Sequence, residues 1–72
     1  MTQAKPPASG SAPMFTAVVK QDGPWWIGWI EEIPGINCQE ATRDELIESL
    51  RVTLGEALLA MIAPYMVHVR DR

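Results

Sequence analysis

The side chains able to carry acid–base or metal chemistry are mostly carboxylates. Glu31 and Glu32 are adjacent, and Asp44, Glu45 and Glu48 follow a few residues later. Paired carboxylates can hold two magnesium ions about 4 Å apart for hydrolysis. Adjacent residues of a strand point to opposite faces, and the later three fall at the start and on the solvent side of a predicted helix, where they favour its dipole. We therefore expect no catalytic residues and no cofactor.

The chain has a single cysteine, Cys38, and a single histidine, His68. One cysteine cannot form an internal disulfide, and no Cys/His cluster has zinc spacing. His68 has no nucleophile or base near it in the sequence, so no metal site is expected. We interpret Cys38 as a small buried apolar residue. A free thiol, the lack of a secretion-type leader and the lack of a membrane-length apolar run predict a cytoplasmic location.

The charge is acidic where the folded body should be. The 72 residues carry a net charge of -3, and eight acidic residues against three basic ones between Met14 and Ala63 give that segment a net charge of -5. Such a body repels phosphate, so direct DNA binding is not expected. It would attract a basic partner.

Pro, Ala, Ser and Gly dominate the first 13 residues, which have no apolar period. This composition predicts a disordered tail at residues 1–13, followed by one domain at residues 14–72. The alternation that begins at Met14 predicts a first strand, and Asp22 and Gly23 supply a turn. A second strand is expected from Trp25 to Ile30.

Pro34 and Gly35 interrupt the chain after the second strand, because proline lacks an amide donor and glycine permits a positive φ. A short third strand is predicted for residues 36–39. Thr42 and Glu45 have capping-box spacing, so a helix should open at Arg43 and continue to about residue 63, before a proline. Its apolar positions form one stripe: Leu46, Ile47, Leu50, Leu54, Ala57, Leu58 and Met61.

The predicted elements, with a fourth edge strand at residues 65–69, follow the order β-β-β-α-β. The fold class is therefore α+β, a small sheet with one helix packed on one face. For the first hairpin we expect Lys20 to pair with Trp25 and Ala17 to lie opposite Gly28, whose small size admits the helix. A three-residue loop with a bulge would exchange the two faces.

The face away from this helix would carry several large apolar side chains. It holds Val18, Trp25, Ile27 and Trp29, and each tryptophan can bury about 150–250 Å². Together with Glu31 and Glu32 at the strand end, these residues form the predicted partner or oligomer interface. Alternatively, the tail or the C-terminal strand covers the rings, or they stay exposed.

Several motifs together resemble the HicB family of toxin–antitoxin antitoxins, over roughly residues 14–58. The residues that carry the resemblance are Phe15-Thr-Ala-Val-Val-Lys, Asp22-Gly23, Trp25-Trp-Ile-Gly-Trp-Ile, Glu32-Ile-Pro-Gly35, Gln39, Thr42 and the acidic helix with Leu50-Arg51. The resemblance implies a partial ribonuclease-H-like fold. It also implies an antitoxin that covers a small basic HicA-type mRNA-cleaving toxin and self-associates as a dimer or tetramer.

The chain departs from the family pattern in two places. Fuller members carry a C-terminal DNA-binding segment, which we do not expect here because the sequence reaches only Arg72, and Glu40 occupies a position that is usually glycine. Two other functions stay open. The chain could be a solitary homo-oligomeric regulatory or scaffold protein without a toxin, or a sheet that stacks single-stranded RNA on Trp25 and Trp29, with Lys20 as the basic neighbour in the hairpin.

Overall fold

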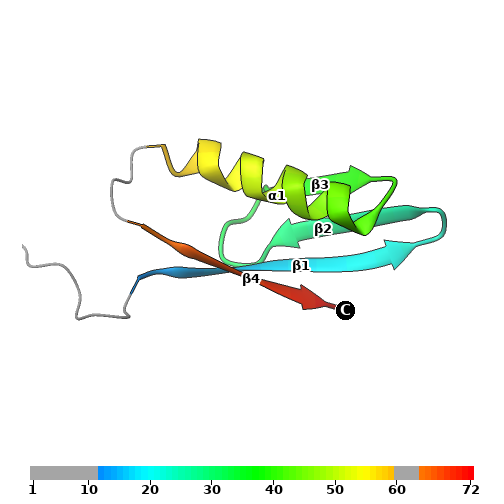
Figure 1. Cartoon of the computed structure of the whole chain (residues 1–72), viewed down its shortest axis with the longest axis horizontal. Helices are drawn as coiled ribbons and strands as arrows, with labels where there is room; N and C mark the ends of the chain where they lie inside the picture. The colour runs from blue at the N-terminus through cyan, green and yellow to red at the C-terminus, as the bar shows by residue number, and fades with distance from the viewer. Residues whose placement is uncertain (1–11, 60–63) are drawn as a thin grey trace, which may run out of the picture.

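A four-stranded sheet carries a helix on one of its faces. The computed structural model describes residues 12–59 and 64–72. They form β1 (Met14–Asp22), β2 (Trp25–Ile30), β3 (Asn37–Glu40), α1 (Arg43–Ala57) and β4 (Met66–Asp71) (Figure 1). The predicted α+β class and the order β-β-β-α-β are confirmed. No helix among these residues has the length and apolar character needed to cross a bilayer.

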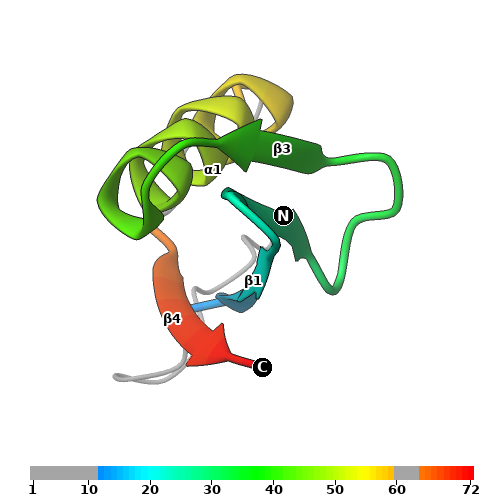
Figure 2. The ribbon, with the colours of Figure 1, turned by 90° about the vertical axis from the view of Figure 1, so that its right-hand side faces the viewer.

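The sheet is mixed, with the strand order β3-β2-β1-β4. The pairs β1–β2 and β2–β3 are antiparallel, whereas β1 and β4 are parallel. Figure 2 shows the sheet from one end, where it curves around the core and α1 lies along its concave side. A parallel pair needs a long connection, and α1 is part of the one between β1 and β4. The two edges of the sheet are therefore β3 and β4.

The apolar stripe of α1 packs on β1, β2 and β3. Leu46, Leu50 and Leu54 recur every four residues and are fully buried, as expected for one face of a helix. Gly28 makes this approach possible, since a Cβ atom there would lie 2.9 Å from Leu50 Cδ1. The sheet residues of the core are Ala17, Val19 and Ile30, which confirms the predicted helix-bearing face.

The predicted register of the first hairpin is wrong by two residues. Asp22, not Lys20, pairs with Trp25, and Val19 rather than Ala17 lies opposite Gly28. The loop is Gly23 and Pro24, and Gly23 has φ +62°. A glycine with positive φ at the first loop position suits a type II′ hairpin, and the fixed φ of proline is tolerated next to it. Because the error is an even number of residues, the division of side chains between the two faces is unchanged.

The predicted capping box at the start of α1 is confirmed in part. The Glu45 backbone N–H donates to the Thr42 hydroxyl at 3.1 Å. The Glu45 carboxylate does not return to the Thr42 backbone amide as a full capping box would. It accepts from the Thr42 hydroxyl instead, also at 3.1 Å.

The end of α1 comes earlier than the sequence predicted. The helix stops at Ala57, where the Leu58 N–H bonds both Leu54 O and Gly55 O, and the Leu59 N–H bonds Glu56 O. The bonds to Gly55 O and Glu56 O span three residues, as in a 3₁₀-helix, and tighten the last turn. Gly55 also lowers the helix propensity of this turn. The predicted helical residues 60–63, Met61 among them, lie outside the described residues.

The last two strands are displaced by one residue at their starts. β3 begins at Asn37, because Ile36 turns into the core and is only 7% exposed. β4 begins at Met66, and Tyr65 instead packs edge-to-face on Phe15 with ring centroids 5.9 Å apart. Pro13, assigned to the tail, accepts a hydrogen bond from the Met66 N–H. Residues 1–11 of the predicted tail lie outside the described residues.

Candidate functional site

The candidate site is the face of the sheet away from α1, called the open face below. Paired residues of neighbouring strands point to the same face, and residues alternate along each strand. The pairings therefore place these side chains together: Thr16, Val18 and Lys20 of β1, Trp25, Ile27 and Trp29 of β2, Asn37 and Gln39 of β3, and Met66, His68 and Arg70 of β4. No described helix covers this face.

Three of the predicted interface residues meet on the open face of β2. Trp25 is 46% exposed, and Ile27 and Trp29 are partly buried. Val18, the fourth predicted apolar residue, lies on the same face but is fully buried. Its neighbours across the strands are Trp29 and Arg70, whose long side chains can cover the smaller valine. Val18 therefore supports the open face from below.

A shallow hollow of about 310 Å³ lies between β2 and β3. Ile27 and Trp29 line it from one strand, and Asn37 and Gln39 from the other. The backbone at Gly28 and Cys38 completes the lining. Such a hollow can receive one side chain or one planar ring, with two amide groups available for hydrogen bonds.

Polar side chains of β4, and that of Arg72 directly after it, join the tryptophans on the open face, and the sequence analysis missed them. The Arg72 guanidinium carbon lies 5.7 Å from the Trp29 ring centroid, a cation–π contact. Arg70 and His68 are exposed on the same face. The alternation along residues 66–71 was visible in the sequence, but only the parallel pairing with β1 assigns these side chains to the tryptophan face.

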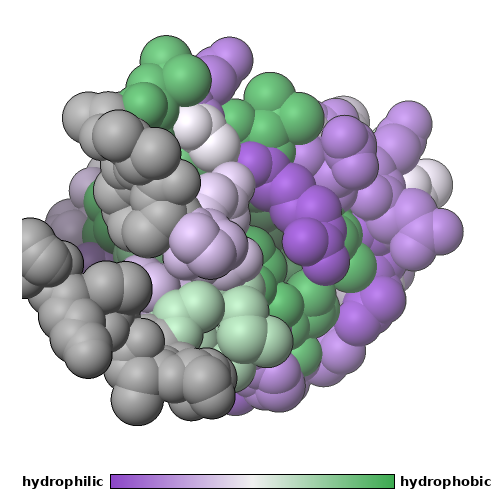
Figure 3. All heavy atoms as spheres, turned by 60° about the vertical axis from the view of Figure 1, so that its left-hand side comes forward, coloured by the Kyte–Doolittle hydropathy of each residue, from purple (hydrophilic) through white to green (hydrophobic). Residues whose placement is uncertain are grey.

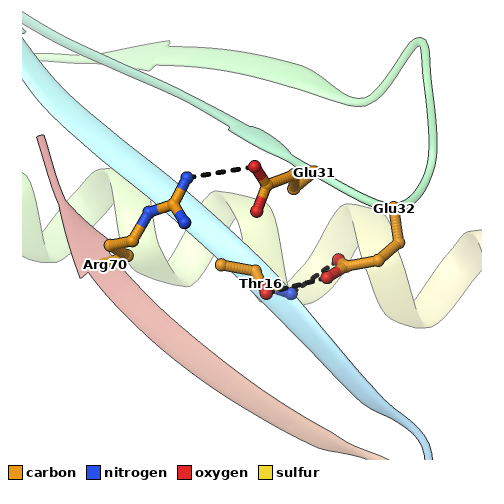
Figure 4. Close-up of polar contacts among 4 residues, drawn as sticks. All are labelled: Thr16, Glu31, Glu32 and Arg70. Atoms are coloured by element: carbon orange, nitrogen blue, oxygen red, sulfur yellow. Dashed lines mark hydrogen bonds and ion pairs between the residues drawn. The ribbon is translucent and has the colours of Figure 1, made fainter.

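Glu31 and Glu32 directly follow β2 and make contacts within the chain (Figure 4). Glu31 forms an ion pair with Arg70 at 3.0 Å, and both side chains are about half exposed. The Glu32 carboxylate accepts from the Thr16 N–H and from the Thr16 hydroxyl, each at 2.7 Å. Both predicted interface carboxylates thus lie at the rim of the open face with intramolecular partners.

The contacts of Glu32 determine its ionisation. Partial desolvation raises the pKa of the Glu32 carboxyl, but the two hydrogen bonds from Thr16, aided by the positive charge of Arg70, together lower it more. The net result is a pKa below the usual value of about 4.5. Glu32 is therefore a fixed anion at neutral pH and holds the turn after β2 to β1.

The four structural-motif residues lie away from the open face. Pro34 and Gly35 form the exposed turn before β3, where Gly35 has φ +96° as predicted for a glycine. Thr42 and Glu45 cap α1. These residues position the elements and have no direct part in the site.

The groups considered for chemistry stay apart. Cys38 is partly buried, and its Sγ lies 3.8 Å from Thr53 Oγ1. His68 is exposed on the opposite side of the sheet. Within residues 12–59 and 64–72, no three His, Cys, Asp or Glu side chains gather as metal ligands would.

A second apolar area lies at the far end of the open face. Met14 and Met66 pair across β1 and β4 and are 54% and 51% exposed. Figure 3 shows the side of the molecule at which these strands begin, with hydrophobic atoms in a band bordered by hydrophilic side chains. The open face is thus apolar near both ends.

No family model matches the chain, and no curated protein or solved structure matches it significantly.

Proposed function

We propose that this chain is an antitoxin-type binding module that docks a small basic HicA-type mRNA-cleaving toxin through its open face and performs no catalysis itself. The observation that carries the proposal is the group Trp25, Ile27 and Trp29 on a sheet face that α1 does not cover. The resemblance of the sequence to HicB antitoxins supports the choice of partner.

The open face has the make-up of a protein contact. Aromatic side chains are enriched in protein interfaces, especially where a pocket lies beside them. Trp25 is nearly half exposed, and the hollow next to Trp29 can receive one side chain of a partner. The rim is polar, with the Glu31–Arg70 ion pair on one side. An apolar centre with a polar rim is the usual anatomy of a protein docking surface.

The distribution of charge favours a basic partner. The α1 side carries six carboxylates and two guanidinium groups, a net charge of -4, on Glu40, Arg43, Asp44, Glu45, Glu48, Arg51, Glu56 and Asp71. The open face and its rim carry three of each sign, on Lys20, Asp22, Glu31, Glu32, Arg70 and Arg72. The negative field of the whole body attracts a cationic protein over long range. The neutral open face then imposes no charge repulsion at contact.

A co-expression experiment tests the proposal. The probe is a short basic reading frame of about 60–90 residues next to the gene, within the size of one small domain. Its expression should arrest growth with mRNA cleavage, and this chain should relieve the arrest. The Trp25→Ser variant should lose the relief, whereas the Glu56→Gln variant, altered on the exposed side of α1, should keep it. Equal relief by both variants, or no toxic neighbour, would contradict the proposal.

A second candidate function is binding of single-stranded RNA. The contact between Arg72 and Trp29, with Asn37 and Gln39 next to it, offers stacking, a cation and amide groups in one place. This combination is used to bind unpaired bases. Titration with mixed-sequence RNA at low salt tests it. Micromolar or tighter binding that is lost in Trp29→Ser would replace the docking proposal, and the absence of binding would remove this candidate.

A further inference from the structure

We infer that the outer edge of β4 pairs with β4 of a second copy of this chain, antiparallel and about a two-fold axis at His68. The contact uses the outer backbone edge of β4, which β1 separates from Trp25 and Trp29 on β2, so the inference goes beyond the proposed function and does not depend on it.

The backbone of β4 presents hydrogen-bonding groups outward. The Met66 N–H donates to Pro13 O, and the Arg72 N–H donates to Val19 O. In a strand, the N–H and C=O groups of alternate residues point to opposite edges, so even-numbered residues of β4 face β1. The groups of Val67, Val69 and Asp71 consequently face away from the sheet, with no strand among the described residues beside them.

The β4 edge has little of the usual protection against strand addition. Proteins block such edges with charged side chains, proline, bulges, short strands or a covering helix. The charged residues of β4, Arg70 and Asp71, are held in ion pairs with Glu31 and Arg43 of the same chain. β4 has six residues without proline or glycine, and none of them has a positive φ. The other edge strand, β3, has only four residues and packs under α1, where the Ser49 hydroxyl donates to the Glu40 carboxylate at 2.6 Å. β4 is therefore the more open of the two edges.

Two apolar side chains of β4, Val67 and Val69, are incompletely buried. α1 packs on β1, β2 and β3, so Val67 and Val69 lie at the flank of the core and are only partly buried. An added strand would place further apolar side chains beside them. A second copy of β4 supplies such side chains with its own Val67 and Val69. A two-fold contact brings the same strand from both copies together.

The two-fold arrangement restricts the register. Residues whose backbone N–H and C=O groups point away from β1 must pair with the same kind of residue in the second copy. Odd-numbered residues of β4 therefore lie opposite odd-numbered ones. With His68 on the axis, Val67 lies opposite Val69 of the second copy, and Met66 lies opposite Arg70. With Val69 on the axis, Val67 would oppose Asp71 instead.

An axis at Arg70 would place two guanidinium groups directly opposite each other, which is destabilising. An axis at Val67 would bring Asp71 opposite residue 63 and leave a shorter ladder between the described residues. The register centred on His68 therefore combines apolar pairing, the absence of like-charge pairs and the longest ladder.

Cysteine cross-linking on the isolated chain tests the register. In the Cys38→Ser background, His68→Cys places two thiols in a directly opposed pair that is not hydrogen-bonded, with Cα atoms about 4.5 Å apart, within disulfide range. Oxidised glutathione should yield a disulfide-linked dimer of twice the 8.0 kDa chain mass on a non-reducing gel.

Two matched controls lie on the same face of the same strand. Met66→Cys and Arg70→Cys, each alone, should not cross-link, because each thiol would be about 13 Å along the strand from its copy. A mixture of these two variants should cross-link. Equal cross-linking of all three single variants, or none by His68→Cys, would overturn the inference.

Light scattering provides a readout without cysteines. The unmodified chain should show dimer mass at concentrations up to about 1 mM, where even weak complexes form. His68→Lys, which opposes two positive charges at the axis, should show monomer mass. A monomer throughout the unmodified series would also overturn the inference. The Trp25→Ser variant should remain dimeric, so failure of the docking proposal leaves this result unchanged.

Discussion

The Glu32 carboxylate accepts hydrogen bonds from the two donor groups of Thr16, its backbone N–H and its hydroxyl, at 2.7 Å each. The adjacent Glu31 N–H donates to Thr16 O at 2.9 Å. The turn after β2 therefore completes the hydrogen bonding of β1 where the backbone ladder between the two strands ends. A side chain takes the place of a strand residue at this position.

The bond between Glu32 and Thr16 should make stability depend on pH. Because the folded-state pKa of Glu32 is lowered, its contribution is fully present above the ordinary value of about 4.5 and is lost as pH falls through the lower folded value. The lowered pKa of Asp71, caused first by its hydrogen bonds from Arg43, acts in the same direction. The melting temperature of Glu32→Gln should therefore lie below that of the wild type at neutral pH, and the difference between the two should shrink in acid.

Glu48→Gln is the matched control for that series. Glu48 is exposed on α1, and its variant should follow the wild-type pH profile. A gap for Glu32→Gln that is the same at every pH would contradict the assigned role of the carboxylate.

Substitution of Gly28 should destabilise the fold. A Cβ atom there would lie 2.7 Å from Val18 O, a backbone atom, and 3.1 Å from Leu46 Cδ2. Relieving these overlaps requires β1 and β2 to shift relative to each other as well as α1 to move off the sheet, so Gly28→Ala should cost about 1–3 kcal/mol, as overpacking does. Urea unfolding followed by tryptophan fluorescence measures the change, and a variant as stable as wild type would show that the packing is looser than described.

Substitution of Gly55 should have the opposite effect. A Cβ atom there would lie 3.5 Å from the Tyr65 hydroxyl oxygen, an ordinary contact. Alanine is favoured over glycine in a helix by about 1 kcal/mol. Gly55→Ala should therefore raise the free energy of unfolding by up to about that amount. A loss of stability in the same urea titration would indicate that this glycine is needed for the end of α1.

The two faces of the sheet should respond differently to truncation. Leu50 is fully buried, so Leu50→Ala should cost about 2–5 kcal/mol and unfold much of a marginal domain. Trp25→Ser, at an exposed position, should change stability by less than about 1 kcal/mol. Circular dichroism of both variants tests this, and equal loss of helix signal would reverse the assignment of the faces.

The sequence was informative where side-chain periods decide the structure. β2 has its predicted bounds, and the start of α1 at Arg43 follows from Thr42. The features that were missed depend on choices between alternative local conformations of similar energy. The hairpin register depended on which two residues form the loop, and Gly23 with Pro24 formed it rather than Asp22 with Gly23. The end of α1 depended on the shift to three-residue hydrogen bonds at Leu58 and Leu59.

The composition of the open face could be predicted only in part. Trp25, Ile27 and Trp29 follow from strand alternation, which survives a register error of two residues. The burial of Val18 and the presence of Arg70 depend on the pairing of β1 with β4. That pairing joins residues about fifty positions apart, and no local pattern specifies it.

The separation of net charge from exposed aromatic surface means that dissolved ions act oppositely on the two sides of the molecule. Ions screen the carboxylates around α1 beyond about 8 Å at physiological strength, while strongly excluded salts such as sulfate reinforce apolar contacts. A ligand held against the sheet should thus bind more tightly as sulfate is added, and one held against the helix should be released.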